Sequence, residues 1–208
     1  SHSIWCERRF IFPVANSNSI FAGADVETVL GNTRITRMGS ATLPQLALSV
    51  RQPWAWAIIF GGKTIENRSV GSIKGGGMDL RTICIHAATG MSEKEYRWAV
   101  WRLQQDGITL PRPDELVRGA IIGTVDVVDI VTDSDSPWFG KREENCGLVL
   151  ENPKPISPLP AKGELGYFKW EADGELSKMK PWMTSYDIAN GDDQTLSLFP
   201  DMPQSFSK

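Results

Sequence analysis

Apolar and polar positions change character several times between residues 44 and 172, and the pattern predicts strands joined by loops and a few helices. Short apolar runs rich in β-branched residues and bounded by Gly, Pro or polar clusters are typical of strands. Five such runs occur, at Leu48–Val50, Ile83–Ala88, Ala120–Val131, Gly147–Leu150 and Gly166–Trp170. Because loops and only one or two helices separate them, we expect an α+β fold, a small mixed β-barrel flanked by a few helices, and not a doubly wound parallel sheet.

The clearest helix is predicted to begin after Ser92. Ser92 and Glu95 have the spacing of a capping box, in which each side chain bonds the backbone at the other position. Apolar residues then recur along one helical face, at Tyr96, Ala99, Val100 and Leu103. This period predicts an amphipathic helix that Gly107 terminates.

A second, shorter helix is predicted between the first strand and a group of charged residues. Pro53 stands where a helix would start, since the first helical turn tolerates its missing N–H. The following residues are almost wholly apolar as far as Phe60, and Gly61-Gly62 supplies a helix stop. Three charged side chains come directly after this stop, on Lys63, Glu66 and Arg68.

The spacing of these charged residues admits two interpretations. If the segment is extended, successive side chains alternate between faces. Ile65 would then point to the core, while Thr64, Glu66 and Arg68 share the other face and Lys63 leans over it. An ammonium, a carboxylate and a guanidinium would converge in one pocket. The alternative is a solvated edge strand whose surface Glu–Arg pair contributes little to stability.

Other candidate residues also have a structural alternative. In the turn-rich segment Asp133–Gly140, Ser136 could donate a hydrogen bond to a ligand and Trp138 could stack on a base. The same two positions suit a loop tip anchored by aromatic side chains. His86 ends an apolar strand, where a histidine whose hydrogen bonds are satisfied in the core is more common than a catalytic base. Asp126 lies on the polar side of a long strand, as either a catalytic carboxylate or a solvent-facing residue.

Composition narrows the class of protein. The chain has 208 residues, 41% of them hydrophobic, which suits one folded domain with tails. No apolar run is long enough to span a membrane. The three cysteines, Cys6, Cys84 and Cys146, are far apart and include no CxxC, so we expect reduced thiols, a cytoplasmic location, no metal site and no cofactor.

The charge balance disfavours tight binding to long duplex nucleic acid. The chain carries 22 basic and 25 acidic residues, a net charge of −3, without a dense basic cluster. Duplex-binding proteins usually carry a strongly basic face. A nucleoside, a nucleotide or a short single strand fits this balance better, and Arg51, Lys63 and Arg68 could form a local patch for one or two phosphates.

The chain divides into three zones. Residues 1–43 are irregular and rich in Asn, Ser and Thr, and Met38-Gly39-Ser40 resembles a translation start, which would place the residues before it upstream or in an added segment. Residues 44–172 form the predicted domain. Residues 173–208 are polar and rich in Pro, Gly, Asp and Ser, and we expect a largely extended, flexible tail.

Several segments resemble one family in the right order. Residues 61–68, GGKTIENR, are similar to the G-x-K-x-x-E-x-R motif of ASCH domains, which are relatives of the PUA RNA-binding fold. Leu48–Trp54 resembles the opening strand and helix start of that family. Further matches follow at 83–88, 118–125 and 160–168, so the resemblance covers roughly residues 46–172. It implies a PUA-like barrel that binds RNA or a modified nucleoside.

The resemblance also implies that hydrolysis is one possible activity, because some ASCH members are hydrolases. One bacterial branch removes the acetyl group of 4-acetylcytidine; there, Lys63 would be the activating or nucleophilic amine, Glu66 would move protons and Arg68 would orient the substrate. That branch has threonine three residues after the lysine, whereas this chain has Glu66, which could keep Lys63 protonated. In a ribonuclease, Lys63 and Arg68 would stabilise the phosphorane-like charge, with Glu66 or His86 as base and no metal.

The competing hypothesis is a non-catalytic domain that recognises single-stranded nucleic acid. Arg51 and Lys63 would hold phosphates, while Trp54 or Trp138 stacks on a base. The residues that we expect to bind substrate in either case are Arg51, Gln52, Trp54, Thr64, Ser136 and Trp138.

The polar C-terminal zone contains one short apolar pattern. Gln194-Thr195-Leu196-Ser197-Leu198-Phe199 resembles the peptides by which bacterial proteins dock on the replication sliding clamp. Leu196, Leu198 and Phe199 could fill a groove while Gln194 supplies a polar anchor. Alternatively, these residues pack back on the domain and cover an apolar edge.

Overall fold

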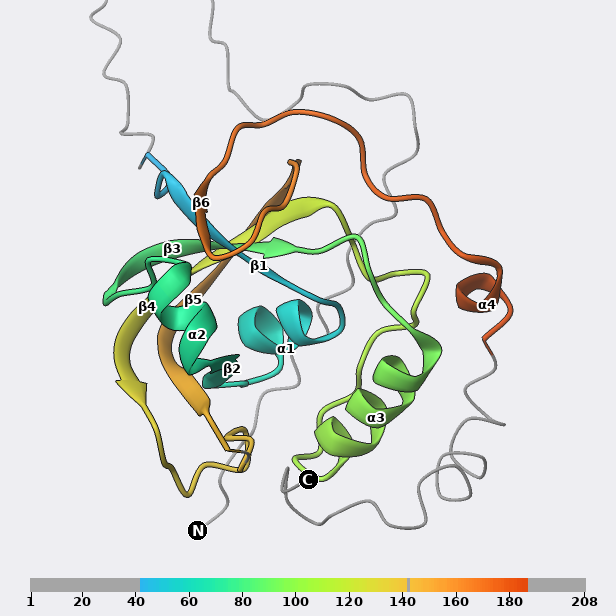
Figure 1. Ribbon diagram of the computed structural model, residues 1–208. Helices are drawn as coiled ribbons and strands as arrows, with labels where there is room; N and C mark the ends of the chain where they lie inside the picture. Colours follow the sequence, from blue (N-terminus) through green and yellow to red (C-terminus); the bar gives the residue numbers. More distant parts are fainter. Residues whose placement is uncertain (1–41, 142, 187–208) are drawn as a thin grey trace, which may run out of the picture. The chain divides into compact units, whose positions relative to one another are not determined.

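The computed structural model describes residues 42–141 and 143–186, and six strands and four helices occur in that part of the chain. The strands are β1 (Leu46–Val50), β2 (Ile65–Ser69), β3 (Arg81–Ala87), β4 (Ala120–Val131), β5 (Asn145–Pro160) and β6 (Tyr167–Lys169). The helices are α1 (Trp54–Phe60), α2 (Val70–Gly75), α3 (Glu93–Gln104) and α4 (Pro181–Thr184), as Figure 1 shows.

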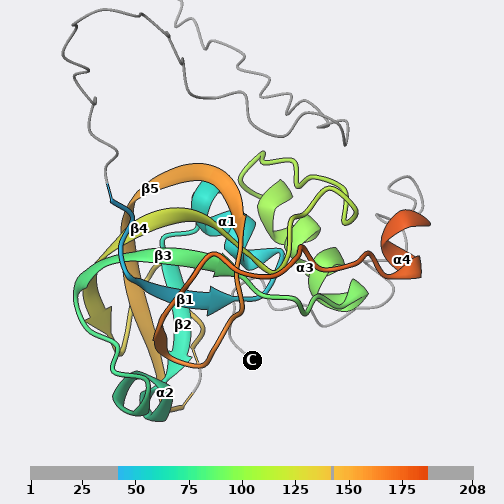
Figure 2. The same cartoon turned by 90° about the horizontal axis from the view of Figure 1, so that it is seen from above.

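All six strands belong to one sheet with the order β2-β5-β4-β3-β1-β6. The β1–β3 pair is parallel and the other pairs are antiparallel, so the sheet is mixed. Three strands separate β2 from β1, yet Arg68 Nη2 on β2 lies 2.7 Å from the Ser49 carbonyl oxygen on β1. The sheet is therefore strongly curled, as Figure 2 shows from above, and side-chain contacts bridge its two sides. The predicted α+β class with a small mixed, barrel-like sheet is confirmed.

Two strands differ from the sequence prediction. The charged segment after α1 is a strand of the sheet, β2, which raises the number of strands from five to six. β5 continues ten residues beyond Leu150, through Pro153, Pro155, Pro158 and Pro160. This second half pairs with β4 alone, because β2 pairs only with the first half of β5. Proline lacks a donor but is tolerated where one edge of a strand stays open.

Helix α1 fills the inside of the curled sheet. Its buried residues Ala55, Ile58 and Ile59 belong to the same core cluster as apolar side chains of β1, β3, β4 and β5. Gly123 on β4 permits this approach, because a Cβ there would lie 2.6 Å from Ile59 Cδ1. The helix starts after Pro53 and ends at Gly61, as the sequence predicts.

Helix α3 carries a second core cluster. The predicted capping box between Ser92 and Glu95 is present, and Tyr96, Ala99 and Leu103 are fully buried. They pack in one cluster with Met183 and Tyr186, which lie in and just after α4. The composition boundary at residue 172 therefore leaves out residues that pack in the domain. The N-terminal extension up to residue 41, Cys6 and the segment from residue 187 lie outside the described residues.

Residues 173–186 form a strap that runs from β6 to α3, and Arg118 fixes its middle. Arg118 donates one guanidinium bond to the Thr89 carbonyl, at 2.7 Å, and another to the Lys178 carbonyl. The Ser177 amide returns a 2.9 Å bond to the Arg118 carbonyl. Figure 1 shows the path of this strap in orange and red.

Candidate functional site

The turn after α1 sets the position of the charged residues. Gly62 takes a positive φ of 67°, a left-handed conformation that favours glycine. The Lys63 amide then donates a 3.0 Å bond back to the Ala57 carbonyl, which fixes the chain before β2 begins. Along β2 the side chains alternate: Ile65 is buried with Ala57 in the α3 cluster, and Glu66 points to the opposite face.

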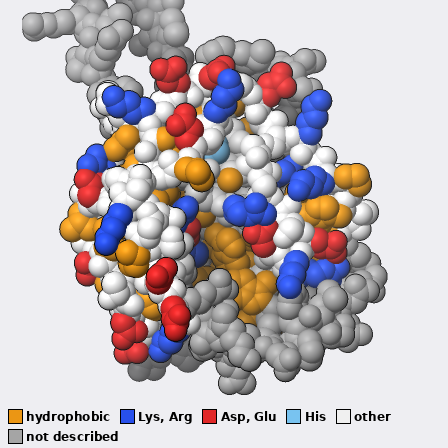
Figure 3. All heavy atoms as spheres, in the orientation of Figure 1, with side chains coloured by type: hydrophobic (Ala, Val, Ile, Leu, Met, Phe, Trp, Pro, Cys, Tyr) orange, Lys and Arg blue, Asp and Glu red, His pale blue; other side chains and the backbone are white. Residues whose placement is uncertain are grey.

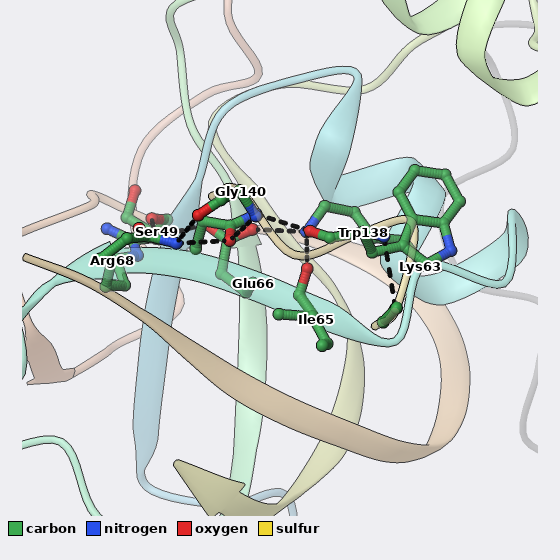
Figure 4. A network of polar contacts seen from close by, with 10 residues as sticks. Ser49, Lys63, Ile65, Glu66, Arg68, Trp138 and Gly140 are labelled. Atoms are coloured by element: carbon green, nitrogen blue, oxygen red, sulfur yellow. Dashed lines mark hydrogen bonds and ion pairs between the residues drawn. The ribbon is translucent and has the colours of Figure 1, made fainter. Parts of the chain in front are cut away.

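Lys63, Glu66 and Arg68 form one connected set of ion pairs, as the alternation predicts (Figure 4). Lys63 Nζ lies 3.0 Å from Glu66 Oε2, and Arg68 Nη2 lies 3.1 Å from Glu66 Oε1. Lys63 also donates to the Ile65 carbonyl, and Arg68 to the Ser49 carbonyl. The side chains are 4%, 11% and 22% exposed in that order along the chain. The guanidinium is thus the group that solvent reaches most.

Burial and charge act on this set in opposite directions. Burial lowers the pKa of Lys63 below its ordinary value, although the Glu66 carboxylate opposes that shift. Burial alone would raise the pKa of Glu66, but Lys63 and Arg68 together hold it below its ordinary value. Glu66 is therefore ionised at neutral pH and lies between two cationic partners.

The set holds two cations and one carboxylate, so it carries excess positive charge in a largely buried place. One buried N–H of Arg68, on Nε, has no hydrogen-bond partner among the described residues. Buried charge is costly unless it is paired and hydrogen-bonded. Chemically, the arrangement can bind an anion or stabilise negative charge that develops on a substrate. Nucleophilic attack by Lys63 would first require its ammonium to lose a proton, and the ammonium now donates hydrogen bonds to Glu66 and to the Ile65 carbonyl.

His86 lies behind this set on β3, opposite Ser49 of β1. Its Nε2 is 3.0 Å from the Ala161 carbonyl, which can only accept, so Nε2 carries the proton and Nδ1 accepts from the Ser49 hydroxyl at 2.9 Å. The ring is 1% exposed, and its burial lowers the pKa. The structure therefore corresponds to the core alternative for His86. Ser49 links this histidine to the charged set, because its hydroxyl bonds His86 and its carbonyl accepts from Arg68.

Two predicted substrate-binding residues already have strong partners at the start of α1. Arg51 makes two bonds to Glu95, at 2.7 and 2.6 Å, while half of its side chain remains exposed. Gln52 is buried; its Nε2 donates to the Val117 carbonyl at 2.7 Å and its Oε1 accepts from the Trp56 amide at 3.0 Å. Arg51 is thus accessible to a ligand that competes with Glu95, whereas Gln52 holds the chain in place.

The remaining predicted residues of this group differ in accessibility. Thr64 is exposed beside Lys63. Trp54 is partly buried and packs edge-on against Trp98 of α3, with ring centroids 4.9 Å apart. Figure 3 shows a hollow lined by hydrophobic side chains in the region between α1 and α3, with basic side chains along part of its rim.

The loop between β4 and β5 is held in place by the buried side chains of Trp138 and Phe139. Trp138 is 4% exposed, and the Arg102 guanidinium of α3 lies 4.2 Å from its ring centroid. Ser136 Oγ accepts a 3.3 Å bond from the Trp138 amide. In this conformation Trp138 anchors the loop, which is the structural alternative that its sequence position allows, and its ring is not open for stacking on a base.

Asn67 is a residue of the site that the sequence analysis did not single out. Its Nδ2 donates to the Trp138 carbonyl at 2.8 Å, and its Oδ1 accepts from the Gly140 amide, also at 2.8 Å. An asparagine between Glu66 and Arg68 on an edge strand was the available signal, because alternation turns its side chain to the opposite face.

Asp126 takes part in a surface network. Its carboxylate accepts from Thr82 Oγ1 at 2.6 Å and from Asn152 Nδ2 at 2.8 Å, and these bonds lower its pKa. This corresponds to the solvent-facing alternative. Within the described ranges, no three His, Cys, Asp or Glu side chains are grouped so that they could hold a metal ion. The helices described there are also too short or too polar to cross a membrane.

Comparisons with known proteins return structural neighbours. No family model and no curated protein matches the chain. Among solved structures, it is similar to the ASCH protein of Zymomonas mobilis, with 16% identity, a TM-score of 0.28, and coverage of 67% of this chain and 90% of that one. Two single-residue variants of that protein match with 15% and 16% identity and TM-scores of 0.32 and 0.31. These variants cover 67% and 74% of this chain, and 93% and 94% of theirs.

Proposed function

We propose that this domain recognises single-stranded RNA or a modified nucleoside or nucleotide at the set formed by Lys63, Glu66 and Arg68. The observation that carries the proposal is the position of Glu66 between two cations, which leaves excess positive charge beside an accessible guanidinium. An anionic or strongly polar ligand would neutralise that charge. The motif resemblance to ASCH domains supports a ligand related to RNA.

The charge of the whole chain favours a short ligand. A net charge of −3 gives no long-range attraction to a duplex. The exposed side of Arg68 and the half-exposed Arg51 could each contact one phosphate of a short strand. Arg51 would exchange its bonds to Glu95 for bonds to the ligand, which makes its contribution smaller than that of Arg68.

Recognition without turnover is the activity that the geometry supports best. Lys63 donates to the Ile65 carbonyl and to Glu66, and both bonds favour the charged ammonium over the free amine. One observation favours hydrolysis as the second candidate, namely the burial that lowers the pKa of Lys63. In that case Glu66 would accept a proton from the attacking hydroxyl, while Lys63 and Arg68 stabilise the negative charge of the transition state.

The test combines binding and turnover. The pure protein is incubated with a panel of modified nucleosides and short single-stranded RNAs, and products are followed by mass spectrometry. Ligand-induced shifts in melting temperature are measured in parallel. Lys63→Ala and Arg68→Ala are compared with Lys154→Ala, which changes an exposed lysine of β5.

The outcomes separate the two candidates. A ligand that stabilises the parent and Lys154→Ala but not Arg68→Ala, without any product, supports recognition. Product from the parent that disappears in Lys63→Ala, with binding retained, supports hydrolysis. A panel that neither binds nor reacts contradicts both.

We also propose docking of the C-terminal segment on a sliding clamp, which stands on the sequence pattern alone. Gln194, Leu196, Leu198 and Phe199 carry the pattern, and they lie outside the described residues. A direct test is retention of the full chain on an immobilised bacterial sliding clamp, compared with a variant carrying Leu198→Ala and Phe199→Ala. Equal retention of the two proteins would remove this proposal.

A further inference from the structure

Asn67 occupies an unusual place in the site, because it lies between Glu66 and Arg68 on β2 while its side chain points the other way. Its amide makes three hydrogen bonds: Nδ2 to the Trp138 carbonyl at 2.8 Å, and Oδ1 from the Gly140 amide at 2.8 Å and from Asn145 Nδ2 at 3.0 Å. Asn145 Nδ2 also bonds the Gly140 carbonyl at 2.6 Å. One side chain of β2 therefore holds two backbone groups of the β4–β5 loop.

The loop has a second support, which is formed by the aromatic side chains at Trp138 and Phe139. Arg102 of α3 stacks on the Trp138 ring and pairs with Asp106 at 2.9 Å. Phe139 packs against Gly147 of β5, where a Cβ would lie 2.6 Å from Ile65 and 3.0 Å from Phe139. Helix, strand and loop thus meet at residues 138–140, and Asn67 provides a polar link from this loop to the charged strand β2.

We propose that Asn67 is a positioning residue, which fixes the loop of residues 132–141 to β2 between the positions of Glu66 and Arg68 and so steadies the strand that carries the charged set. The amide is suited to this role because it offers a donor and an acceptor side by side, which match the carbonyl at Trp138 and the amide at Gly140. Aspartate would keep the acceptor and lose the donor, and alanine would lose both.

The role in ligand binding rests on the proposed function, whereas the hold on the loop does not. Loss of Asn67 should leave Glu66 between Lys63 and Arg68, since β2 remains paired with β5 from Ile65 to Ser69. The loop should then move independently of the charged set. A change in ligand affinity without a change in the Glu66 titration is therefore the specific signature of positioning.

The first measurement is amide hydrogen exchange in the ligand-free protein. In Asn67→Ala, exchange of the Gly140 amide and its loop neighbours should become about tenfold faster, because one hydrogen bond of ordinary strength is lost. Asn67→Asp should restore much of the protection at Gly140, since the acceptor remains. Asn152→Gly, which removes another asparagine hydrogen bond of the sheet, should leave the loop unchanged.

The second measurement separates positioning from general stability. Binding of a fluorescein-labelled single-stranded RNA hexamer should weaken about fivefold or more in Asn67→Ala, while the pH titration of Glu66, followed by carboxyl carbon NMR, stays as in the parent. If Asn67→Ala does not fold, Asn145→Ala removes the supporting bonds and Asn67→Asp the donated bond, and both are read in the same way.

Two results would overturn the inference. One is unchanged loop exchange in a folded Asn67→Ala protein, which would mean that Trp138 and Phe139 hold the loop without the amide. The other is weakened RNA binding together with a shifted Glu66 titration, which would mean that the substitution disturbs the charged set itself. If the parent protein does not bind the RNA, the proposed function fails for that ligand, and the exchange measurement alone decides the role of Asn67.

Discussion

Two arginines of this protein, Arg68 and Arg118, share an unpaired donor but differ in their charged partners and in their exposure to solvent. Each has a buried Nε without a hydrogen-bond partner among the described residues. Arg68 pairs with the Glu66 carboxylate and remains 22% exposed. Arg118 is 3% exposed and donates only to the backbone carbonyls of Thr89 and Lys178, and burial lowers its pKa.

The difference shows that a buried guanidinium does not by itself make a ligand site. Arg118 joins two chain segments, the one after β3 and the strap of residues 173–186, and its donors are directed at fixed carbonyls. Arg68 combines partial exposure with a carboxylate shared by a second cation. The first arrangement stabilises the fold, and the second leaves charge that a ligand can neutralise.

The largest loss of stability that tests this comparison is expected from Glu66→Gln. This change leaves the buried cations of Lys63 and Arg68 without their carboxylate, and removal of one partner from a buried ion pair costs about 3–5 kcal/mol. We expect a loss near the lower limit, because the amide oxygen still accepts one bond. Urea unfolding measures it, and Glu95→Gln, which breaks the exposed pair with Arg51, should cost about 1 kcal/mol or less. Equal losses in the two variants would contradict the view that burial makes the Glu66 set costly to break.

The next largest effect should come from Arg118→Met, which keeps the apolar stem and removes the donors. The carbonyls of Thr89 and Lys178 then lose their partner, and an unsatisfied buried group costs about 1–3 kcal/mol. Hydrogen exchange should become faster in residues 177–186, while ligand binding at Arg68 is unchanged. Arg112→Met, at a partly buried pair with Asp114, is the control. If strap exchange stayed slow in a folded Arg118→Met protein, apolar packing of Met183 would be sufficient to hold the strap.

The convergence of Lys63, Glu66 and Arg68 was one of two arrangements that the sequence allowed, and it could be derived because it depends on local rules. A glycine pair ends α1, a strand follows, and alternation along that strand separates Ile65 from Glu66 and Arg68. These rules need no knowledge of the rest of the chain. The capped helix α3 was predictable for the same reason, since capping box and apolar period lie within one segment.

What the sequence did not predict depends on contacts between distant segments. Asn67 holds a loop more than seventy positions away in the chain, and Trp138 is buried by an arginine of α3. The burial of Met183 was not predicted, because the surrounding residues of the strap are mostly polar. Prolines in β5 argued against a strand, because the sequence alone could not show that this half has an open edge.

A smaller effect is expected in the pH dependence of stability, to which His86 and Glu66 contribute in different pH ranges. Burial lowers the pKa of folded His86 below the ordinary 6.5, so the unfolded chain binds a proton more readily and stability falls as pH decreases from 6.5. The pKa of Glu66 is also lowered, from 4.5, so its contribution is lost only as pH falls below 4.5. We expect the free energy of unfolding to decline in two stages. His86→Gln should flatten the first stage and leave the second, as urea unfolding at a series of pH values would show. A first stage that persists in His86→Gln would assign it to another group.

The smallest effect is expected from Asp126→Asn, and it sharpens the comparison because Asp126 is the carboxylate that a search by sequence alone would rank beside Glu66. Its partners Thr82 and Asn152 are neutral and lie with it on the surface of the sheet. A surface substitution of this kind changes stability by about 0.5 kcal/mol or less. Asparagine can still accept from Thr82, so unfolding and ligand binding should both remain close to those of the parent. A loss of binding comparable with that expected for Arg68→Ala would mean that the functional site extends across the surface of β3, β4 and β5 that carries Thr82, Asp126 and Asn152. The ion pairs of Lys63, Glu66 and Arg68 would then be only a part of that site.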